Sequence, residues 1–152
     1  MTDKQKYMNI AIEEANKCLE TQGFGPFGAC IVKDGKIIAK GNNQVVSSCD
    51  PTNHAEINAI RKACELLQTH DLSGCQLFSS SEPCPMCMSA CYWAKISEIY
   101  YANTVADAAS IGFIDDDLYN FFKSGNFEHI KIEHLENETA IDTFKNYKGL
   151  IY

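Results

Sequence analysis

The chain has 152 residues, 45% of them hydrophobic, which is enough for one domain of common size around a single core. Its formal net charge is −7, from 13 basic and 20 acidic residues, and this acidic balance disfavours a long nucleic-acid substrate. No stretch approaches the roughly 20 apolar residues of a membrane span, and the polar N-terminus has no signal-peptide pattern, so we expect a cytoplasmic protein. The eight cysteines are then expected to be reduced thiols.

Hydrophobic spacing predicts a helix and a hairpin in the first forty residues. Apolar residues recur at helical spacing over 4–20, with charged residues between them. Two short apolar runs follow, at 27–32 and 36–41, and they flank the pair Asp34-Gly35. Because this pair is a strong turn signal, the two runs are expected to be the strands of a β-hairpin.

The rest of the chain is expected to alternate helices with strands. After a polar loop over 42–53, Asp50 can cap a helix that Pro51 opens and that ends near Leu67. The other expected elements are strands at 75–80, 96–102 and 129–135, a helix opened by Pro83 and Pro85, a helical segment starting at Asp115–Asp117, and a helix at 140–147. This order predicts a single α/β domain over 1–152, in which a mixed sheet has helices on both faces.

Four residues that can bind or serve a metal ion form a split cluster. His54 and Glu56 lie in one segment, and Cys84 and Cys87 lie in another. The two thiols are three residues apart at a helix start, so they share one face near the positive end of the helix dipole. Because His54 and Glu56 are only two residues apart, both can serve one site only if the end of their helix faces it. The spacing therefore predicts two helix N-termini that converge on one metal ion.

The ligand types indicate a catalytic zinc site. A tetrahedral zinc with one imidazole and two thiolates keeps its fourth position for water. Such a zinc lowers the pKa of that water from about 15.7 toward roughly 7, and Glu56 can take the proton and return it to a departing amine. A structural zinc with Cys91 as fourth ligand is the alternative, although Cys91 is expected in the core, and iron is the alternative metal. Glu82, beside the thiols, is expected to cap a helix or to be solvated.

These motifs resemble the cytidine deaminase-like superfamily. The pattern H-x-E followed by P-C-x-x-C is that of zinc nucleobase deaminases. The stretches that resemble the branch of guanine deaminases and tRNA wobble-adenosine deaminases are GPFGA at 25–29, VKDG at 32–35, DPTNHAE at 50–56 and AIR at 59–61. Within that branch, 92–94, 107–113 and the terminal Tyr152 are most similar to bacterial guanine deaminases. The resemblance implies a three-layer α-β-α sandwich with a mixed five-stranded sheet, and a homodimer with exchanged C-terminal segments.

The resemblance also implies which residues bind a substrate base. By position, Phe27 and Trp93 would stack on the base or wall it. Asn43 and the backbone of Ala55 would hold a purine. Apart from the resemblance, two aromatic residues of this kind are as often core residues, and an asparagine is an ordinary loop residue.

Two further residues implied by the resemblance lie near the C-terminus. Asp115 would contact the polar edge of the ring and assist proton transfer, and Tyr152 would close the pocket from the partner subunit. The resulting hypothesis is hydrolytic deamination of guanine to xanthine and ammonia, with one Zn²⁺ per chain and Glu56 as the proton shuttle.

Three alternatives to this hypothesis remain open. A tRNA wobble-adenosine deaminase would use the same zinc chemistry but needs phosphate-binding residues. A deaminase of another small aminopurine or of cytosine would differ only at the edges of the pocket. A zinc-stabilised binding module without activity would not need Glu56.

Overall fold

The computed structural model describes residues 1–126, 130–135, 137 and 139–152. The chain divides into two compact units, Met1–Ile114 and Asp115–Tyr152. Among the described residues, no helix is both long enough and apolar enough to cross a membrane. The elements of the first unit are α1 (Asp3–Asn16) with a 3₁₀ turn (Lys17–Leu19), β1 (Gly25–Lys33), β2 (Lys36–Asn43), α2 (Val45–Ser48), α3 (Ala55–Leu67), β3 (Cys75–Ser81), α4 (Pro85–Trp93), β4 (Glu98–Asn103) and α5 (Val105–Ser110).

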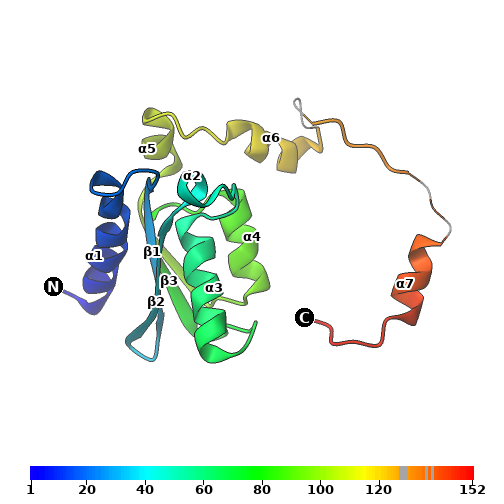
Figure 1. Cartoon of the computed structure of the whole chain (residues 1–152), viewed down its shortest axis with the longest axis horizontal. Coiled ribbons are helices and arrows are strands. Elements are labelled where there is room, and N and C mark those ends of the chain that lie inside the picture. The colour runs from blue at the N-terminus through cyan, green and yellow to red at the C-terminus, as the bar shows by residue number, and fades with distance from the viewer. Residues whose placement is uncertain (127–129, 136, 138) are drawn as a thin grey trace. The chain divides into compact units, whose positions relative to one another are not determined.

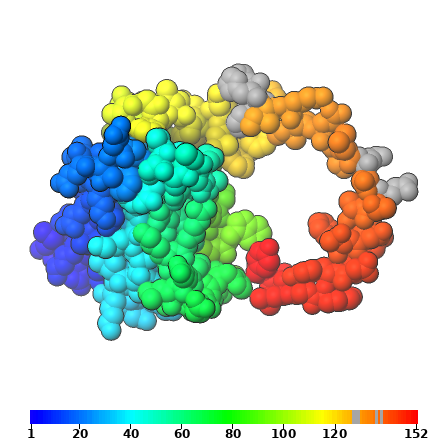
Figure 2. Space-filling model, viewed as in Figure 1, coloured from blue at the N-terminus to red at the C-terminus, as the bar shows by residue number. Residues whose placement is uncertain are grey.

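The first unit is a mixed sheet with helices on both faces, as the sequence predicts. The strand order is β2-β1-β3-β4, where β1 pairs antiparallel with β2 and β3, and β3 pairs parallel with β4. Helix α1 covers one face, and α3 and α4 cover the other (Figure 1). In the view of Figure 2, α1, the β1–β2 hairpin and α3 lie beside one another on a continuous surface.

The two faces of β1 explain its unbroken apolar sequence. Because neighbouring side chains of a strand point to opposite faces, Ala29 and Ile31 pack in the core on the α3 side, whereas Cys30 and Val32 pack on the α1 side. The hairpin turn forms at Asp34 and Gly35, as predicted. Both have positive φ, 49° and 72°, which a two-residue type I′ turn requires.

The predicted fifth strand is wrong for the residues that the structure describes. The sheet has four strands, and residues 130–135 have no regular structure, while His129 lies outside the described residues. The apolar alternation is present at Ile130 and Ile132, but both side chains are exposed. An alternating segment becomes a strand only when a neighbouring strand takes its hydrogen bonds, and the described residues of this single chain offer none at 130–135.

The helix expected to open at Asp50-Pro51 instead begins at Ala55. The carboxylate of Asp50 accepts hydrogen bonds from the backbone N–H and the hydroxyl of Thr52, at 2.8 and 2.6 Å. It therefore caps a local turn and leaves the helix to start later. The expected loop over 42–53 also differs, because β2 continues through Asn43 and one turn of helix, α2, follows it.

The second unit contains α6 (Asp116–Ser124) and α7 (Ala140–Asn146). Both agree with the predicted helices at Asp115–Asp117 and at 140–147. Neither helix has a buried side chain. The large apolar residues exposed among the described part of this unit include Phe122, Ile130, Ile132, Leu135, Phe144, Leu150, Ile151 and Tyr152.

Candidate metal centre

Two helices of the first unit begin beside each other. His54 is the N-cap of α3 and Cys84 is the N-cap of α4, and Cys87 lies in the first turn of α4, two residues after Pro85 at its first position. Neither N-cap side chain makes a capping hydrogen bond. The imidazole and the first thiol therefore remain available to a ligand at the positive ends of two helices.

The three side chains have the spacing of a metal site. Nδ1 of His54 lies 3.6 Å from Sγ of Cys84 and 3.5 Å from Sγ of Cys87, and one ligand atom from each residue lies within 4.8 Å of the others. Zinc bonds of about 2.3 Å to sulfur and 2.0 Å to nitrogen, at tetrahedral angles, place donor atoms roughly 3.5–3.8 Å apart. The donor set and its geometry therefore fit a zinc ion with three protein ligands.

Glu56 lies against this cluster in the buried core. It is the second residue of α3, and only 6% of its surface is exposed. Its Oε1 accepts a hydrogen bond from the Ser79 hydroxyl at 3.1 Å, and its Oε2 lies 3.4 Å from Sγ of Cys87. Burial raises the pKa of this carboxyl above its ordinary value. A carboxyl with a raised pKa can both accept and return a proton near neutral pH.

The two thiols divide one proton between them when no metal is bound. The hydrogen bond from Cys87 lowers the pKa of Cys84 to about 4. The same hydrogen bond, together with burial, raises the pKa of Cys87 well above its ordinary value. A hydrogen bond with Cys84 raises the pKa of His54. These shifts favour a thiolate at Cys84 and a thiol at Cys87.

Metal affinity should rise with pH. Zinc binds thiolates and neutral imidazole, so it must displace the protons of Cys87 and His54. Because both pKa values are raised, these protons compete with the metal over a higher pH range, and this competition weakens as the pH increases. We expect tighter zinc binding at about pH 8 than at about pH 6, with proton release at both. Competition with a chromophoric chelator measures the affinity, and a pH-independent value would contradict this protonation pattern.

The structure places the implied base-binding residues of the first unit as follows. Asn43 ends β2, is 8% exposed, and accepts the Val45 N–H through Oδ1 at 3.2 Å. The backbone N–H of Gln44 bonds to the carbonyl of Asn53 at 3.0 Å, which brings the end of β2 to the segment before His54. Ala55 is fully buried between His54 and Glu56.

The two aromatic residues differ in their surroundings. Phe27 is half-buried and meets the ring of Phe113 edge-on, with centroids 4.9 Å apart. Trp93 ends α4, is 61% exposed, and meets the ring of Tyr92 edge-on. Asp115 and Tyr152 belong to the second unit, where Asp115 is the N-cap of α6. Glu82 contacts a helix start, in agreement with the expected capping role, because its Oε2 accepts the N–H of Val105, the first residue of α5, whose N-cap is Thr104.

Two residues of the site were not identified from the sequence. Ser79 reaches Glu56 from β3, and Asn53 holds the segment before His54 by bonding to Ser48 and Asn58. The signal for Ser79 was the run of three serines just before the cysteine motif, which is unusual at the end of a buried strand. A single sequence does not tell which carboxylate such a hydroxyl meets.

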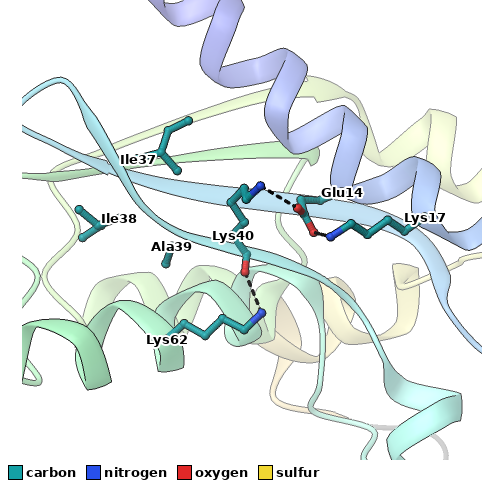
Figure 3. A pocket seen from close by; sticks show the side chains of 7 residues that line it. All are labelled: Glu14, Lys17, Ile37, Ile38, Ala39, Lys40 and Lys62. Carbon is teal, nitrogen blue, oxygen red and sulfur yellow. Dashed lines mark hydrogen bonds and ion pairs between the residues drawn. The ribbon is translucent and has the colours of Figure 1, made fainter.

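A separate hollow of about 340 Å³ lies at the free edge of β2 (Figure 3). Its charged groups are paired within it. The carboxylate of Glu14 contacts the ammonium groups of Lys17 and Lys40 at 2.7 and 3.6 Å, and Lys62 donates to the carbonyl of Lys40 at 3.0 Å. Lysines on an edge strand protect it from pairing with other chains. We therefore interpret this hollow as part of the edge of the sheet and not as a second active site.

The first 103 residues match the family described as the cytidine and deoxycytidylate deaminase zinc-binding region. The chain belongs to this deaminase family. The sequence resemblance is thereby confirmed at the level of the superfamily, as are the enzyme class, a hydrolase acting on nucleobases, and the zinc-binding character of the family.

Relatives of this deaminase act on different substrates, according to their names. It is 56% identical to the guanine deaminase of Bacillus subtilis over 95 residues, which are 62% of this chain and 61% of that relative. It is 41% identical to the tRNA-specific adenosine deaminase of Aquifex aeolicus over 145 residues, which are 95% and 93% of the two chains. The X-ray structure of the Bacillus subtilis guanine deaminase is similar with a TM-score of 0.90 at 39% identity, covering 97% of this chain and 98% of that one. Family membership alone does not select the substrate.

The close contact between Gly41 of β2 and the first turn of α3 allows a test of whether this contact sets the position of His54 and Glu56. A Cβ added at Gly41 would overlap the carbonyl oxygen of Ala55 and lie 2.7 Å from the amide nitrogen of Ala59. Gly41→Ala should therefore push the first turn of α3 away from β2, destabilise the fold by roughly 1–3 kcal/mol, and weaken metal binding. Thermal unfolding and chelator competition measure the two effects.

Gly28→Ala is the matched control for Gly41→Ala. Its added Cβ would overlap the backbone of α1, at Ala11 and Ala15, on the opposite face of the sheet. It should destabilise the fold to a similar extent, while the folded protein keeps its metal affinity. Equal metal affinities for the two variants would mean that the start of α3 does not set the geometry of the site.

Proposed function

We propose that this deaminase is a zinc-dependent hydrolase that converts guanine to xanthine and ammonia. The observation that carries the proposal is the convergence of His54, Cys84 and Cys87 beside the buried Glu56. Three ligands leave a fourth position for water, and the adjacent carboxylate supplies the base. The similarity to the guanine deaminase of Bacillus subtilis, at a TM-score of 0.90 over 97% of the chain, supports guanine as the substrate.

Each residue of the cluster has one task in the proposed reaction. His54, Cys84 and Cys87 would hold the ion, which when bound supplies a Lewis acid that acidifies water. Glu56 takes a proton from the attacking water and gives it to the ring nitrogen. It then carries the proton of the new hydroxyl on C2 to the exocyclic amine, so that the bond from C2 to this amine breaks, C2 becomes a carbonyl and ammonia leaves. The site excludes solvent from this carboxylate, since Glu56 is buried.

The proposal includes the base-binding residues implied by the resemblance. Asn43 and the Ala55 backbone would hold the purine, and Phe27 and Trp93 would flank it. Asp115 would contact the polar edge of the ring, and Tyr152 would close the pocket from the partner subunit. Asn43 and Ala55 are supported by their places beside the His54 segment. Trp93 is supported by its largely exposed ring, which a base could cover.

We also propose that the protein is a homodimer with exchanged C-terminal segments. Helices α6 and α7 bury no side chain within their own unit, although both carry large apolar residues. A second copy of the chain could cover these apolar side chains. Sedimentation at several concentrations tests this, and a monomer at micromolar concentration would contradict it.

A tRNA adenosine deaminase is the second candidate. The 41% identity to the Aquifex aeolicus relative over 95% of this chain favours it. The formal net charge of −7 is against it, because affinity for tRNA comes largely from neutralised phosphates. A small aminopurine other than guanine, or cytosine, would use the same metal cluster.

Ammonia release from a panel of substrates tests the proposal. The zinc-loaded protein is incubated separately with guanine, adenine, cytosine, their nucleosides and tRNA. We expect release from guanine and no inosine in the tRNA. Inosine formation without guanine turnover would establish the second candidate. Zinc retention with no turnover on any substrate would leave a binding module.

A further inference from the structure

One oxygen of the Glu56 carboxylate is held by a hydroxyl group from the interior of the sheet. The Ser79 hydroxyl donates to Oε1 at 3.1 Å, while Oε2 lies on the side of the metal ligands, 3.4 Å from Sγ of Cys87. The two oxygens therefore have different surroundings. We propose that Ser79 is a positioning residue that holds the Glu56 carboxylate with Oε2 turned toward the metal cluster. This inference rests on the proposed deaminase function.

The surroundings of Ser79 make its hydroxyl the natural partner of Glu56. Ser79 is 1% exposed, so bulk water does not compete for this bond. A buried carboxylate without a hydrogen-bond donor is strongly unfavourable, and each buried oxygen is expected to have one. The Ser79 hydroxyl is the donor to Oε1 that comes from the sheet, whereas the backbone N–H of Glu56 itself belongs to the same residue as the carboxylate and moves with it.

The backbone of Ser79 is fixed on both sides. It lies in β3, opposite Ala29 of β1 and opposite Tyr101 of β4. A side chain on an inner strand is held more precisely than one on a loop. Glu56, in contrast, lies at the start of a helix and has three rotatable side-chain bonds. The backbone of β3 therefore fixes the position of the Ser79 hydroxyl, and the hydrogen bond from this hydroxyl restrains the orientation of the Glu56 carboxylate.

Orientation of the carboxylate matters for the proposed proton transfers. Oε1 is occupied by the Ser79 hydroxyl proton, so the water proton would go to Oε2, on the metal side. A carboxylate free to rotate would spend much of its time with neither oxygen aligned. Misplacement of a catalytic group by about 1 Å can lower the rate roughly 100-fold.

Ser80 offers a matched control on the same strand. It is also buried, and its Oγ accepts the backbone N–H of Gly28 at 3.0 Å. Because strand neighbours face opposite sides, Ser80 lies on the α1 side and Ser79 on the α3 side. Ser80→Ala removes one buried hydroxyl, as Ser79→Ala does, but leaves the Glu56 carboxylate with its donor.

The experiment compares Ser79→Ala, Ser80→Ala and Ser79→Thr with the wild type, all loaded with zinc. On the base that the wild type deaminates, Ser79→Ala should lower kcat roughly 10- to 100-fold with KM changed no more than about twofold. Ser80→Ala should keep kcat within about twofold of the wild type, and Ser79→Thr, which keeps a hydroxyl, should recover most of it. Zinc content should be the same in all four proteins. A kcat of Ser79→Ala equal to that of Ser80→Ala would overturn the proposal.

A structural measurement separates this inference from the proposed function. If the wild type deaminates none of the bases, the proposed function fails. Crystal structures of the zinc-loaded proteins then still show whether Ser79 orients the Glu56 carboxylate. The Glu56 carboxylate should rotate in Ser79→Ala and keep its orientation in Ser80→Ala. An unchanged carboxylate in Ser79→Ala would refute a positioning role for this hydroxyl.

Discussion

Glu56→Ala should abolish deamination and leave the metal bound. The side chain touches the metal cluster through Oε2 but is not one of its three ligands. Under the proposed mechanism this variant lacks the group that moves protons between water, ring and amine, so turnover should fall roughly 10²- to 10⁴-fold. The metal content after dialysis should be the same as that of the wild type. Persisting turnover would disprove Glu56 as the proton shuttle.

Glu82→Ala is the matched control for this experiment. Glu82 lies two residues before Cys84, and its carboxylate accepts the N–H of Val105, the first residue of α5, at 3.2 Å. Its loss should cost no more than about 1 kcal/mol of stability, because Thr104 still caps this helix, and should leave kcat near the wild-type value. Comparing the two variants shows whether a loss of activity comes from removing any carboxylate near the cysteine motif or only from removing the carboxylate of Glu56, which faces the metal ligands.

The metal cluster could be predicted because its geometry is encoded locally. Cys84 and Cys87 are three residues apart at a helix start, which fixes their relation without the rest of the fold. His54 and Glu56 are two residues apart and can share a site only at a helix end. The structure indeed has His54 as the N-cap of α3 and Glu56 as its second residue. The helix start was predicted four residues too early, because the Asp50 carboxylate binds Thr52 in a turn.

The contacts that hold the cluster in place could not be predicted in the same way. Ser79 and Glu56 are 23 residues apart, and Gly41 approaches Ala55 across the space between a strand and a helix. Such contacts depend on which face of which strand meets which helix. Alternating apolar residues indicate a strand, but they do not show which strand it would pair with. The strand expected at 129–135 was therefore wrong, because the described residues contain no strand that pairs with this segment.

Cys87→Ser should lose the metal, and the comparison with Cys91 decides between a catalytic and a structural ion. Cys87 is fully buried and lies 3.5 Å from Nδ1 of His54. Serine is a much poorer zinc ligand than a thiolate, so the variant should bind zinc far more weakly and release no ammonia. A structural site would use four protein ligands, with Cys91 as the fourth. Cys91 is 2% exposed and packs in the hydrophobic core with Ala29 and Leu77.

Cys91→Ala should therefore keep its metal and its activity, with only a modest loss of stability from the smaller side chain. Zinc content after dialysis against a chelator, measured for both variants with thermal unfolding alongside, gives the comparison. If both variants lose zinc, the ion has four protein ligands and no position for water, and the deaminase mechanism fails with it. If only Cys87→Ser loses zinc, the open fourth position is established independently of any substrate.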